Sequence, residues 1–283
     1  MIRTELTGSK INITGEPIEA SVIYDCGQCF RFDPVDDGIF KGIVRGRILY
    51  SKTEGDTFTV WPVSPEDTGF IRSFYDLDFD YTEADKKLCS DEVLRKAIPF
   101  SRGMRILRQD PFETIISFII SANNNIKRIK GIINRLCEKC GDRISGSDYA
   151  FPSPSRLASL TENEIFQCGT GYRAPYIYRT VRDILDGFPV SELYSFDYPD
   201  ARKKLMSLMG IGPKVADCIL LFSFGKREAF PKDTWIKKVL LSLYGFEPKN
   251  DRDLTEFVKN TFPEFAGLAQ QYLFNYARQN GII

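Results

Sequence analysis

The sequence contains no histidine, and that absence removes several kinds of active site. Ser-His-Asp triads, Cys-His nucleophile pairs and HExxH zinc sites all require at least one histidine. General acid–base catalysis by an imidazole ring is excluded for the same reason.

The chain also lacks a long apolar run without charges, so a transmembrane span is not expected. Its first residues, MIRTELTGSK, lack the hydrophobic region of a signal peptide, which predicts a cytoplasmic protein, nucleoid-associated if the source is prokaryotic. The formal net charge is +0, and this neither favours nor opposes nucleic acid, because binding requires only a local basic patch. The 283 residues, 43% of them hydrophobic, are enough for a large core and two domains.

The cysteines argue against both a disulfide framework and a metal site. Their number, 7, is odd, and disulfides are rare in cytosolic proteins. Two CxxC pairs occur, CGQC at 26–29 and CEKC at 137–140, and they could share a zinc ion only if they met in space. The first pair precedes a strand pattern and Cys137 lies on the apolar stripe of a predicted helix, so reduced structural thiols are favoured and no metal is predicted.

An α+β fold is predicted, with an N-terminal antiparallel β-sheet subdomain over residues 1–100 and a two-part all-helical domain over 101–283. Residues 38–62 form three short runs with apolar residues at every second position, broken by RG and EGD, which is typical of an antiparallel meander. VIYDCGQCFRF, residues 22–32, is interpreted as another strand pair with a glycine break. Helical patterns begin at Ser64.

Three segments of the second domain carry clear helix signals. In DPFETIISFIISANNN (110–125), Asp110 is the predicted N-cap and Pro111 the first helical residue, and apolar side chains on all faces predict a central buried helix. Residues 126–140 place one apolar stripe on a helix, formed by Ile126, Ile129, Ile133, Leu136 and Cys140. Thr161 and Glu164 form a predicted capping box.

The stretch LMGIGPKVADCIL, residues 208–220, predicts two helices joined by a tight turn, a helix-hairpin-helix over about 199–224. Gly210 and Gly212 would supply positive φ angles and let backbone N–H groups approach an anion. The second helix begins at the same place, so its positive end would face that anion. A phosphate of a nucleic-acid backbone is the natural ligand, and an ordinary helical hairpin with a glycine turn is the alternative.

Lys214 lies in the first turn of this second helix, which is otherwise apolar. It could bind a phosphate, or it could be a nucleophilic amine. A free lysine, with a pKa of about 10.4, is almost entirely protonated at neutral pH. A helix N-terminus and partial burial both disfavour the cation, so they would lower this pKa and increase the nucleophilic fraction. Cys218, four residues on, would face the same pocket.

Asp233 follows in the segment FPKDTW, residues 230–235. After Pro231 it is well placed as the N-cap of a helix running through Ile236 and Val239. Its other interpretation is electrostatic, because a carboxylate near the amine would support a developing cation.

These segments together resemble a known family, the 8-oxoguanine DNA glycosylases of the eukaryotic type within the helix-hairpin-helix Gly/Pro-Asp DNA glycosylase superfamily. The resemblance extends over nearly the whole chain, with the motifs in the same order. It rests on YDCGQCFRF (24–32), QDPFETIISFIISANNNIKRIKGIINRLC (109–137), GTGYRAPYI (169–177), GIGPKVADCI (210–219), FPKD (230–233) and AGLAQQYLF (266–274).

The resemblance implies a bifunctional glycosylase/AP lyase that excises 8-oxoguanine from duplex DNA, preferentially opposite cytosine, by a Lys214 Schiff base and β-elimination, with Asp233 as the second catalytic residue. It implies base flipping into a pocket. The pocket residues would be Gly27, whose carbonyl accepts the N7–H of the lesion, Cys218 and Phe274, which sandwich the base, and Gln270, which bonds its Watson–Crick edge.

Four further residues are assigned to the DNA by the same resemblance. Asn123 would fill the gap left by the flipped base, Arg128 and Arg173 would bond the opposite cytosine, and Tyr172 would wedge into the stack. Gly210 and Gly212 would contact the DNA backbone. The protein is expected to act as a monomer on double-stranded DNA.

The sequence departs from the family at Trp235, where a histidine is usual, so any contact made by that histidine is in doubt. No cysteine follows Cys218, so the iron–sulfur cluster of related enzymes is not expected and no cofactor is predicted. Two alternatives remain: a glycosylase for alkylated bases or adenine, which typically lacks the lysine, and a non-catalytic module that uses the hairpin only to bind phosphates.

Overall fold

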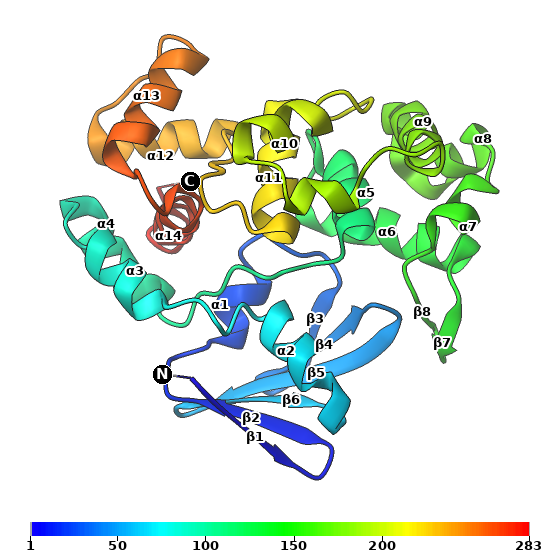
Figure 1. Cartoon of the computed structure of the whole chain (residues 1–283), viewed down its shortest axis with the longest axis horizontal. Coiled ribbons are helices and arrows are strands. Elements are labelled where there is room, and N and C mark those ends of the chain that lie inside the picture. Colours follow the sequence, from blue (N-terminus) through cyan, green and yellow to red (C-terminus); the bar gives the residue numbers. More distant parts are fainter. Residues whose placement is uncertain (1, 283) are drawn as a thin grey trace.

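The computed structural model describes residues 2–282 and consists of an antiparallel sheet with a larger helical part beside it (Figure 1). The sheet has six strands in the order β1-β2-β6-β5-β4-β3. The predicted α+β class, with the sheet first and helices after it, is confirmed. The strands are β1 (Arg3–Thr7), β2 (Lys10–Thr14), β3 (Phe32–Asp36), β4 (Ile39–Val44), β5 (Arg47–Glu54) and β6 (Thr57–Trp61).

The meander predicted over 38–62 is β4, β5 and β6, each paired antiparallel with the next. The two connecting turns contain Gly46 and Gly55, with φ angles of 75° and 58°, which suit tight hairpins. Alternate residues of the sheet, such as Leu49, Phe58 and Val60, are buried in one core.

Residues 22–32 do not form the predicted strand pair, and that interpretation is wrong. The segment begins as the short helix α1 (Ala20–Tyr24), whose first turn is capped by the Glu19 carboxylate accepting from the Ser21 N–H. The chain then turns through Gly27 and pairs only from Phe32 onward. The apolar alternation was misleading because Ile23 and Tyr24, adjacent in the sequence, are both buried.

The helical part surrounds α5 (Pro111–Ser121), on which every residue from Thr114 to Ser121 is buried. Asp110 caps it and Pro111 is its first residue, as predicted. The other helices are α2 (Thr68–Phe74), α3 (Tyr81–Leu88), α4 (Glu92–Ala97), α6 (Ile126–Cys140), α7 (Pro154–Ala158), α8 (Glu162–Ile165), α9 (Ala174–Leu185), α10 (Tyr198–Leu205), α11 (Pro213–Ile219), α12 (Thr234–Tyr244), α13 (Asp251–Thr261) and α14 (Ala266–Gln279). Short 3-10 or π turns cover η1 (Pro65–Asp67), η2 (Ile98–Ser101), η3 (Phe166–Thr170), η4 (Gly171–Arg173), η5 (Ser191–Tyr194) and η6 (Leu220–Phe224).

Several details of this part differ from the sequence-based expectation. A small hairpin, β7 (Arg143–Ser145) with β8 (Asp148–Tyr149), interrupts the helices. Ile126, predicted on the buried stripe of α6, is 39% exposed because it lies in the first turn, whereas the rest of that stripe is buried. The capping box of Thr161 and Glu164 is present as predicted.

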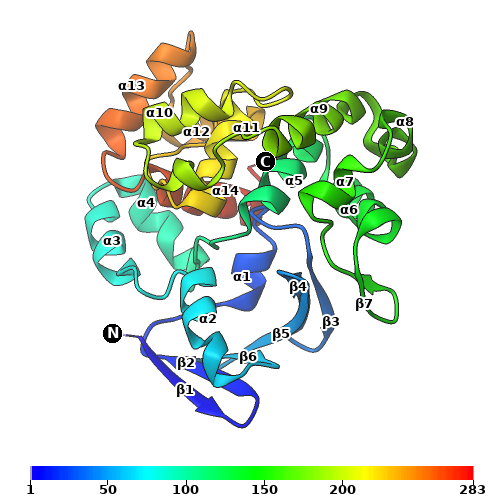
Figure 2. The same ribbon diagram turned by 45° about the vertical axis from the view of Figure 1, so that its right-hand side comes forward.

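Helices α3 and α4 precede residue 100 but pack in the helical core, against the C-terminal helix. The Tyr272 hydroxyl of α14 donates to Asp85 at 2.6 Å, and the Asn275 amide bonds the Phe100 carbonyl. In two views α1 lies between the sheet and the helices, so the CGQC segment that follows it is at the junction of the two parts (Figure 1, Figure 2).

Across residues 2–282, we find no helix with both the length and the apolar character required to cross a membrane.

Candidate active site

The turn between α10 and α11 places Lys214 at the start of a buried helix. Gly210 has a φ of 84°, and a Cβ at this position would lie 2.7 Å from the Tyr176 Cβ, so a side chain would not fit. The prediction of a positive φ at both glycines is wrong for Gly212, whose φ is −86° and ψ −179°, because it is the extended N-cap residue of α11.

Lys214 is the second residue of α11 and is half-buried. Its Nζ lies 5.7 Å from the centroid of the Phe118 ring on the central helix α5. Cys218, one turn further, is buried, and burial raises the pKa of its thiol to about 11, although the adjacent Lys214 acts in the opposite direction. The thiol is therefore neutral near pH 7 and provides a small apolar surface beside the amine.

Asp233 is the N-cap of α12, as predicted. Its Oδ1 accepts from the Ile236 N–H at 2.8 Å. Its negative charge makes a small contribution to the raised pKa of the Cys218 thiol, after burial of the thiol itself. Trp235, at the position usually held by histidine, is 47% exposed, and its ring faces the Lys238 ammonium at 4.7 Å.

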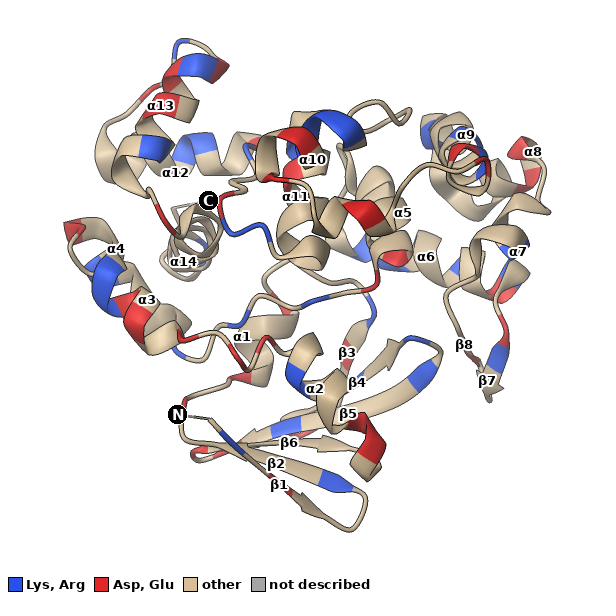
Figure 3. Cartoon of the chain, in the orientation of Figure 1, with Lys and Arg blue, Asp and Glu red and all other residues tan. Residues whose placement is uncertain are grey.

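A basic groove of about 710 Å³ runs alongside Lys214. It is lined by Tyr198, Pro199, Arg202, Lys203, Met206, Ser207, Pro213, Lys214, Lys232, Asp251, Arg252 and Thr255. The positive charge of Arg202 is neutralised by the fully buried Asp217, whose Oδ1 lies 2.6 Å from the Arg202 Nε. The lysines of the groove remain available to bind an anion. Charges of both signs are spread over the chain, and basic positions occur on α10, α12 and α13 (Figure 3). A neutral chain thus still has a local basic surface beside the hairpin.

The residues assigned to the base pocket do not line this groove; they come from the CGQC segment, α11 and α14. Gly27 is half-buried with a φ of 79°, and a Cβ built on it would meet no atom within 4 Å. An ion pair joins Arg278 of α14 to Asp25 at 3.1 Å. Gln270 and Phe274 lie on the same helical face as Arg278, so that face is directed towards the CGQC segment.

Aromatic contacts connect this segment to the amine. The Phe30 ring, directly after CGQC, lies 5.5 Å from the Phe118 ring, which in turn faces Lys214. Gln270 is buried, whereas Phe274 is half-buried and belongs to neither hydrophobic core of the described chain. A partly exposed Phe outside the core has free surface on which a ligand ring can stack.

Asn123, Arg128 and Tyr172 are exposed residues beyond the C-terminal end of α5. Asn123 has a φ of 49°, an unusual conformation for a residue with a side chain. Arg128 is exposed on the first turn of α6. Tyr172 is 53% exposed, and its hydroxyl donates to the Ala122 carbonyl at 3.2 Å.

Arg173 differs from these three because only 2% of it is exposed. Its guanidinium donates to the carbonyl oxygens of Ala122, Asn123 and Thr170, with the bond to Asn123 at 2.9 Å. In this conformation Arg173 supports the strained turn at Asn123 and does not present its donors to a base.

The two CxxC pairs do not create a metal centre in the structure. Over residues 2–282, no three Cys, Asp or Glu side chains are grouped so that they could hold a metal ion. Burial raises the pKa of Cys26 to about 11 and of Cys137 to about 12, so these thiols are protonated near pH 7.

Sequence reasoning missed three residues around the site. The sequence indicated Phe118 only as part of a buried helix and Gln28 only as part of the CGQC motif. It gave Gln271 no role. Gln271 is buried, and its Nε2 donates to Gln270 Oε1 at 2.6 Å, which orients the Gln270 amide. A glutamine within an apolar helix face was the only signal in the sequence.

Comparison with known proteins gives two family matches that together cover most of the chain. Residues 10–115 match the 8-oxoguanine DNA glycosylase N-terminal domain, and residues 116–264 match the HhH-GPD superfamily of base excision DNA repair proteins. A probable N-glycosylase/DNA lyase of Methanothermobacter thermautotrophicus is 37% identical over 236 residues, 75% of this chain and 75% of that protein. An N-glycosylase/DNA lyase of Saccharomyces cerevisiae is 37% identical over 166 residues, 53% of this chain and 44% of that protein.

A solved structure shares the fold over nearly the whole chain. The 8-oxoguanine glycosylase/lyase of Clostridium acetobutylicum, in complex with double-stranded DNA containing cytosine opposite 8-oxoguanine, superposes with a TM-score of 0.93 at 38% identity. The match covers 99% of this chain and 98% of that one. The chain therefore belongs to the HhH-GPD superfamily of base excision DNA repair proteins and, within it, to the 8-oxoguanine DNA glycosylase/lyases.

Proposed function

We propose that this protein excises 8-oxoguanine from duplex DNA, preferentially opposite cytosine, and then cleaves the strand at the resulting site. The placement of Lys214, at the start of the buried helix α11 and one turn before the neutral Cys218, is the observation that carries the proposal. The Clostridium acetobutylicum relative, which binds a duplex with cytosine opposite 8-oxoguanine, supports the substrate.

The amine acts as the nucleophile in this proposal. The Lys214 Nζ attacks C1′ of the damaged nucleotide with its lone pair, the glycosidic bond breaks, and the base leaves with its bonding electrons. The departed base takes one proton from the attached nitrogen. The nitrogen lone pair then forms a double bond to C1′ as the C1′–O4′ bond breaks, O4′ takes a proton from solvent, and a protonated imine remains. Removal of a C2′ proton expels the 3′ phosphate by β-elimination. The Asp233 carboxylate stabilises the positive charge that develops on the sugar and the imine.

The groove beside Lys214 suits the DNA backbone. Its lysines and arginines lie next to the Gly210–Gly212 turn, and a Cβ on Gly212 would meet no atom within 4 Å, so this residue leaves room for a phosphate. In this proposal Asn123 fills the space of the flipped base and Tyr172 wedges beside it, because both are exposed on adjacent turns. Cys218 and Phe274 sandwich the base while Gln270 bonds its edge.

Single-turnover reactions with 8-oxoguanine:C and guanine:C duplexes test this function. Base release and strand cleavage are measured in the same samples. We expect both products from the lesion duplex and neither at a comparable rate from guanine. Strong excision of alkylated bases or adenine with none of 8-oxoguanine would contradict the proposal, and so would binding without any base release.

We predict that Arg128→Ala reduces discrimination in favour of cytosine opposite the lesion. A side chain that reads one base edge contributes about 1–3 kcal/mol of selectivity, whereas a phosphate contact weakens all duplexes alike. Excision rates are compared opposite C, A, G and T. Equal losses of excision rate on all four duplexes would show that Arg128 contacts only the DNA backbone.

Arg173→Ala is predicted to destabilise the fold and, because it releases the Asn123 turn that Arg173 holds, to weaken the same discrimination indirectly. Its removal leaves the buried Thr170 carbonyl without the guanidinium donor, a loss that costs about 1–3 kcal/mol, and it also removes the part-buried bonds to Ala122 and Asn123. Thermal unfolding is measured beside the excision rates. A variant that keeps both its melting temperature and its preference for cytosine would exclude both roles.

Gly27→Ala is predicted to slow lesion excision by at least about tenfold, because the methyl group would enter the open space expected to hold the base. The matched control is Gly8→Ala in the β1–β2 turn, where φ is also positive, at 60°, and a Cβ likewise meets nothing within 4 Å. Both variants bear similar backbone strain. Equal activity in the two would show that Gly27 does not line the pocket.

A further inference from the structure

Gln28 is a fully buried side chain whose polar atoms are all bonded to the backbone. Its Nε2 donates to the carbonyl oxygens of Ile23 and Arg105, both at 2.9 Å. Its Oε1 accepts from the Leu107 N–H, also at 2.9 Å. Its own carbonyl accepts from Gln109 Nε2 at 2.6 Å. The side chain and the main chain of this one residue are therefore both held in place.

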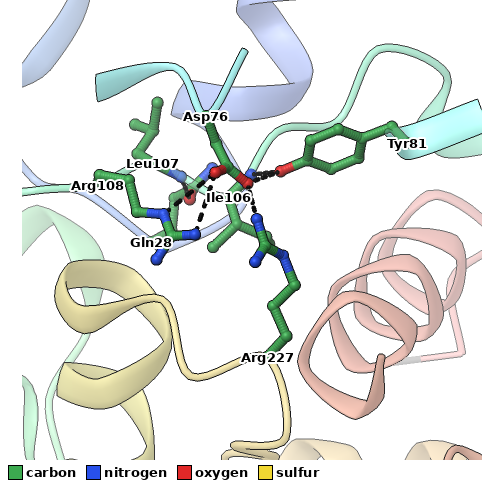
Figure 4. A network of polar contacts seen from close by, with 7 residues as sticks. All are labelled: Gln28, Asp76, Tyr81, Ile106, Leu107, Arg108 and Arg227. Carbon is green, nitrogen blue, oxygen red and sulfur yellow. Dashed lines mark hydrogen bonds and ion pairs between the residues drawn. The ribbon is translucent and has the colours of Figure 1, made fainter. Parts of the chain in front are cut away.

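The Gln28 side chain bonds the segment 105–107, and this segment is also held in place by Tyr81 and Asp76 (Figure 4). The Tyr81 hydroxyl accepts from the Ile106 N–H at 2.7 Å and donates to Asp76 at 2.9 Å. Asp76 also pairs with Arg108 at 3.1 Å and with Arg227 at 2.6 Å. Gln28 is thus attached to a fixed support and not to a mobile loop.

The Gly27 carbonyl belongs to the peptide group that ends at the Gln28 nitrogen. Glycine imposes little restraint on its own φ and ψ angles, so the direction of this carbonyl depends on its neighbours. No donor within residues 2–282 bonds it. We propose that Gln28 is a positioning residue for lesion recognition, which holds the Gly27 carbonyl oxygen in the direction required to accept N7–H of 8-oxoguanine. This inference rests on the proposed function.

The physical reason is that the two bases differ little in shape. At N7 the lesion carries a hydrogen and guanine carries a lone pair, so the distinction depends on an acceptor fixed at the correct distance and angle. Hydrogen bonds weaken steeply as they bend. A carbonyl free to rotate would avoid the guanine lone pair and lose part of its bond to the lesion.

Gln28→Met tests this because methionine has a similar length but forms none of the three side-chain bonds. Excision from an 8-oxoguanine:C duplex is compared with borohydride trapping on an abasic-site:C duplex, which has no base to recognise. We expect excision to fall at least about tenfold, while trapping on the abasic site stays near the wild-type level. A purely structural role would lower both together and leave their ratio unchanged.

Tyr81→Phe is the matched control. It removes the bond to the Ile106 N–H on the same segment and the bond to Asp76, but leaves the Gln28 bonds in place. We expect a loss of thermal stability with the ratio of excision to trapping unchanged.

An unchanged ratio in folded Gln28→Met, or an equal change in Tyr81→Phe, overturns the inference. If Gln28→Met does not fold, Gln109→Met is measured instead, since it removes only the bond to the Gln28 carbonyl. A lower ratio in that variant supports the inference and an unchanged ratio rejects it. If the wild-type protein does not excise 8-oxoguanine, the proposed function itself fails; if it does and the ratio is unchanged, only the inference fails.

Discussion

Lys214→Gln is expected to abolish excision and covalent trapping while leaving binding to the lesion duplex. Glutamine is close to lysine in length but has no amine to attack C1′, so the single-turnover rate should fall by at least roughly 1,000-fold. Binding is measured by fluorescence anisotropy on the same duplex. Substantial residual excision would remove Lys214 from the nucleophile role and favour attack by water.

Lys232→Gln is the matched control, because Lys232 lines the same groove and burial lowers its pKa. Its amine donates to the Thr255 hydroxyl at 2.6 Å, towards α13, whereas Lys214 lies beside Cys218. We expect Lys232→Gln to keep trapping and to lose only some affinity for DNA. The opposite pattern would make Lys232 the nucleophile.

Asp76→Ala is expected to give the largest loss of stability, about 3 kcal/mol or more in the free energy of unfolding. The carboxylate pairs with Arg108 and Arg227 and accepts from Tyr81, so its removal leaves two largely buried cations without a partner (Figure 4). In a chain of this size, that loss lowers the melting temperature by roughly 6–12 °C. Calorimetry at neutral pH measures it directly.

Two variants separate the contributions to that loss. Asp76 has a φ of 52°, which asparagine tolerates better than alanine, so Asp76→Asn isolates the missing charge. Asp78→Ala removes a carboxylate that is 72% exposed and pairs with Arg72, so it should change stability little. If Asp76→Ala and Asp78→Ala had the same effect, the Asp76 network would not stabilise the fold.

Local signals in the sequence were sufficient for much of the fold. Asp110 before Pro111, the Thr161–Glu164 pair and Asp233 after Pro231 are caps whose side chains bond the following backbone, so position alone predicts them. The meander over 38–62 was equally clear, because its turns and its alternation agree. The helix α1 was missed because its cap is a glutamate, which is uncommon at that position.

Long-range contacts were not predictable in the same way. The sequence contains no sign that Arg278 pairs with Asp25, or that Asp76 joins Arg108 to Arg227. Arg173 shows the same for the site residues. The motif GYRA does not indicate that the Arg173 guanidinium donates to the carbonyls of the 122–123 turn. Motif spacing identified the residues, and only the fold shows which atoms they face.

The central claim is that Lys214 forms a covalent imine with the sugar of the damaged nucleotide. Borohydride trapping of the wild-type protein on an 8-oxoguanine:C duplex, followed by mass mapping of the adduct, tests it most directly. We predict a stable protein–DNA adduct whose modified peptide contains Lys214, formed at the rate of base release. Base release without any adduct, or an adduct on another residue, would contradict the claim.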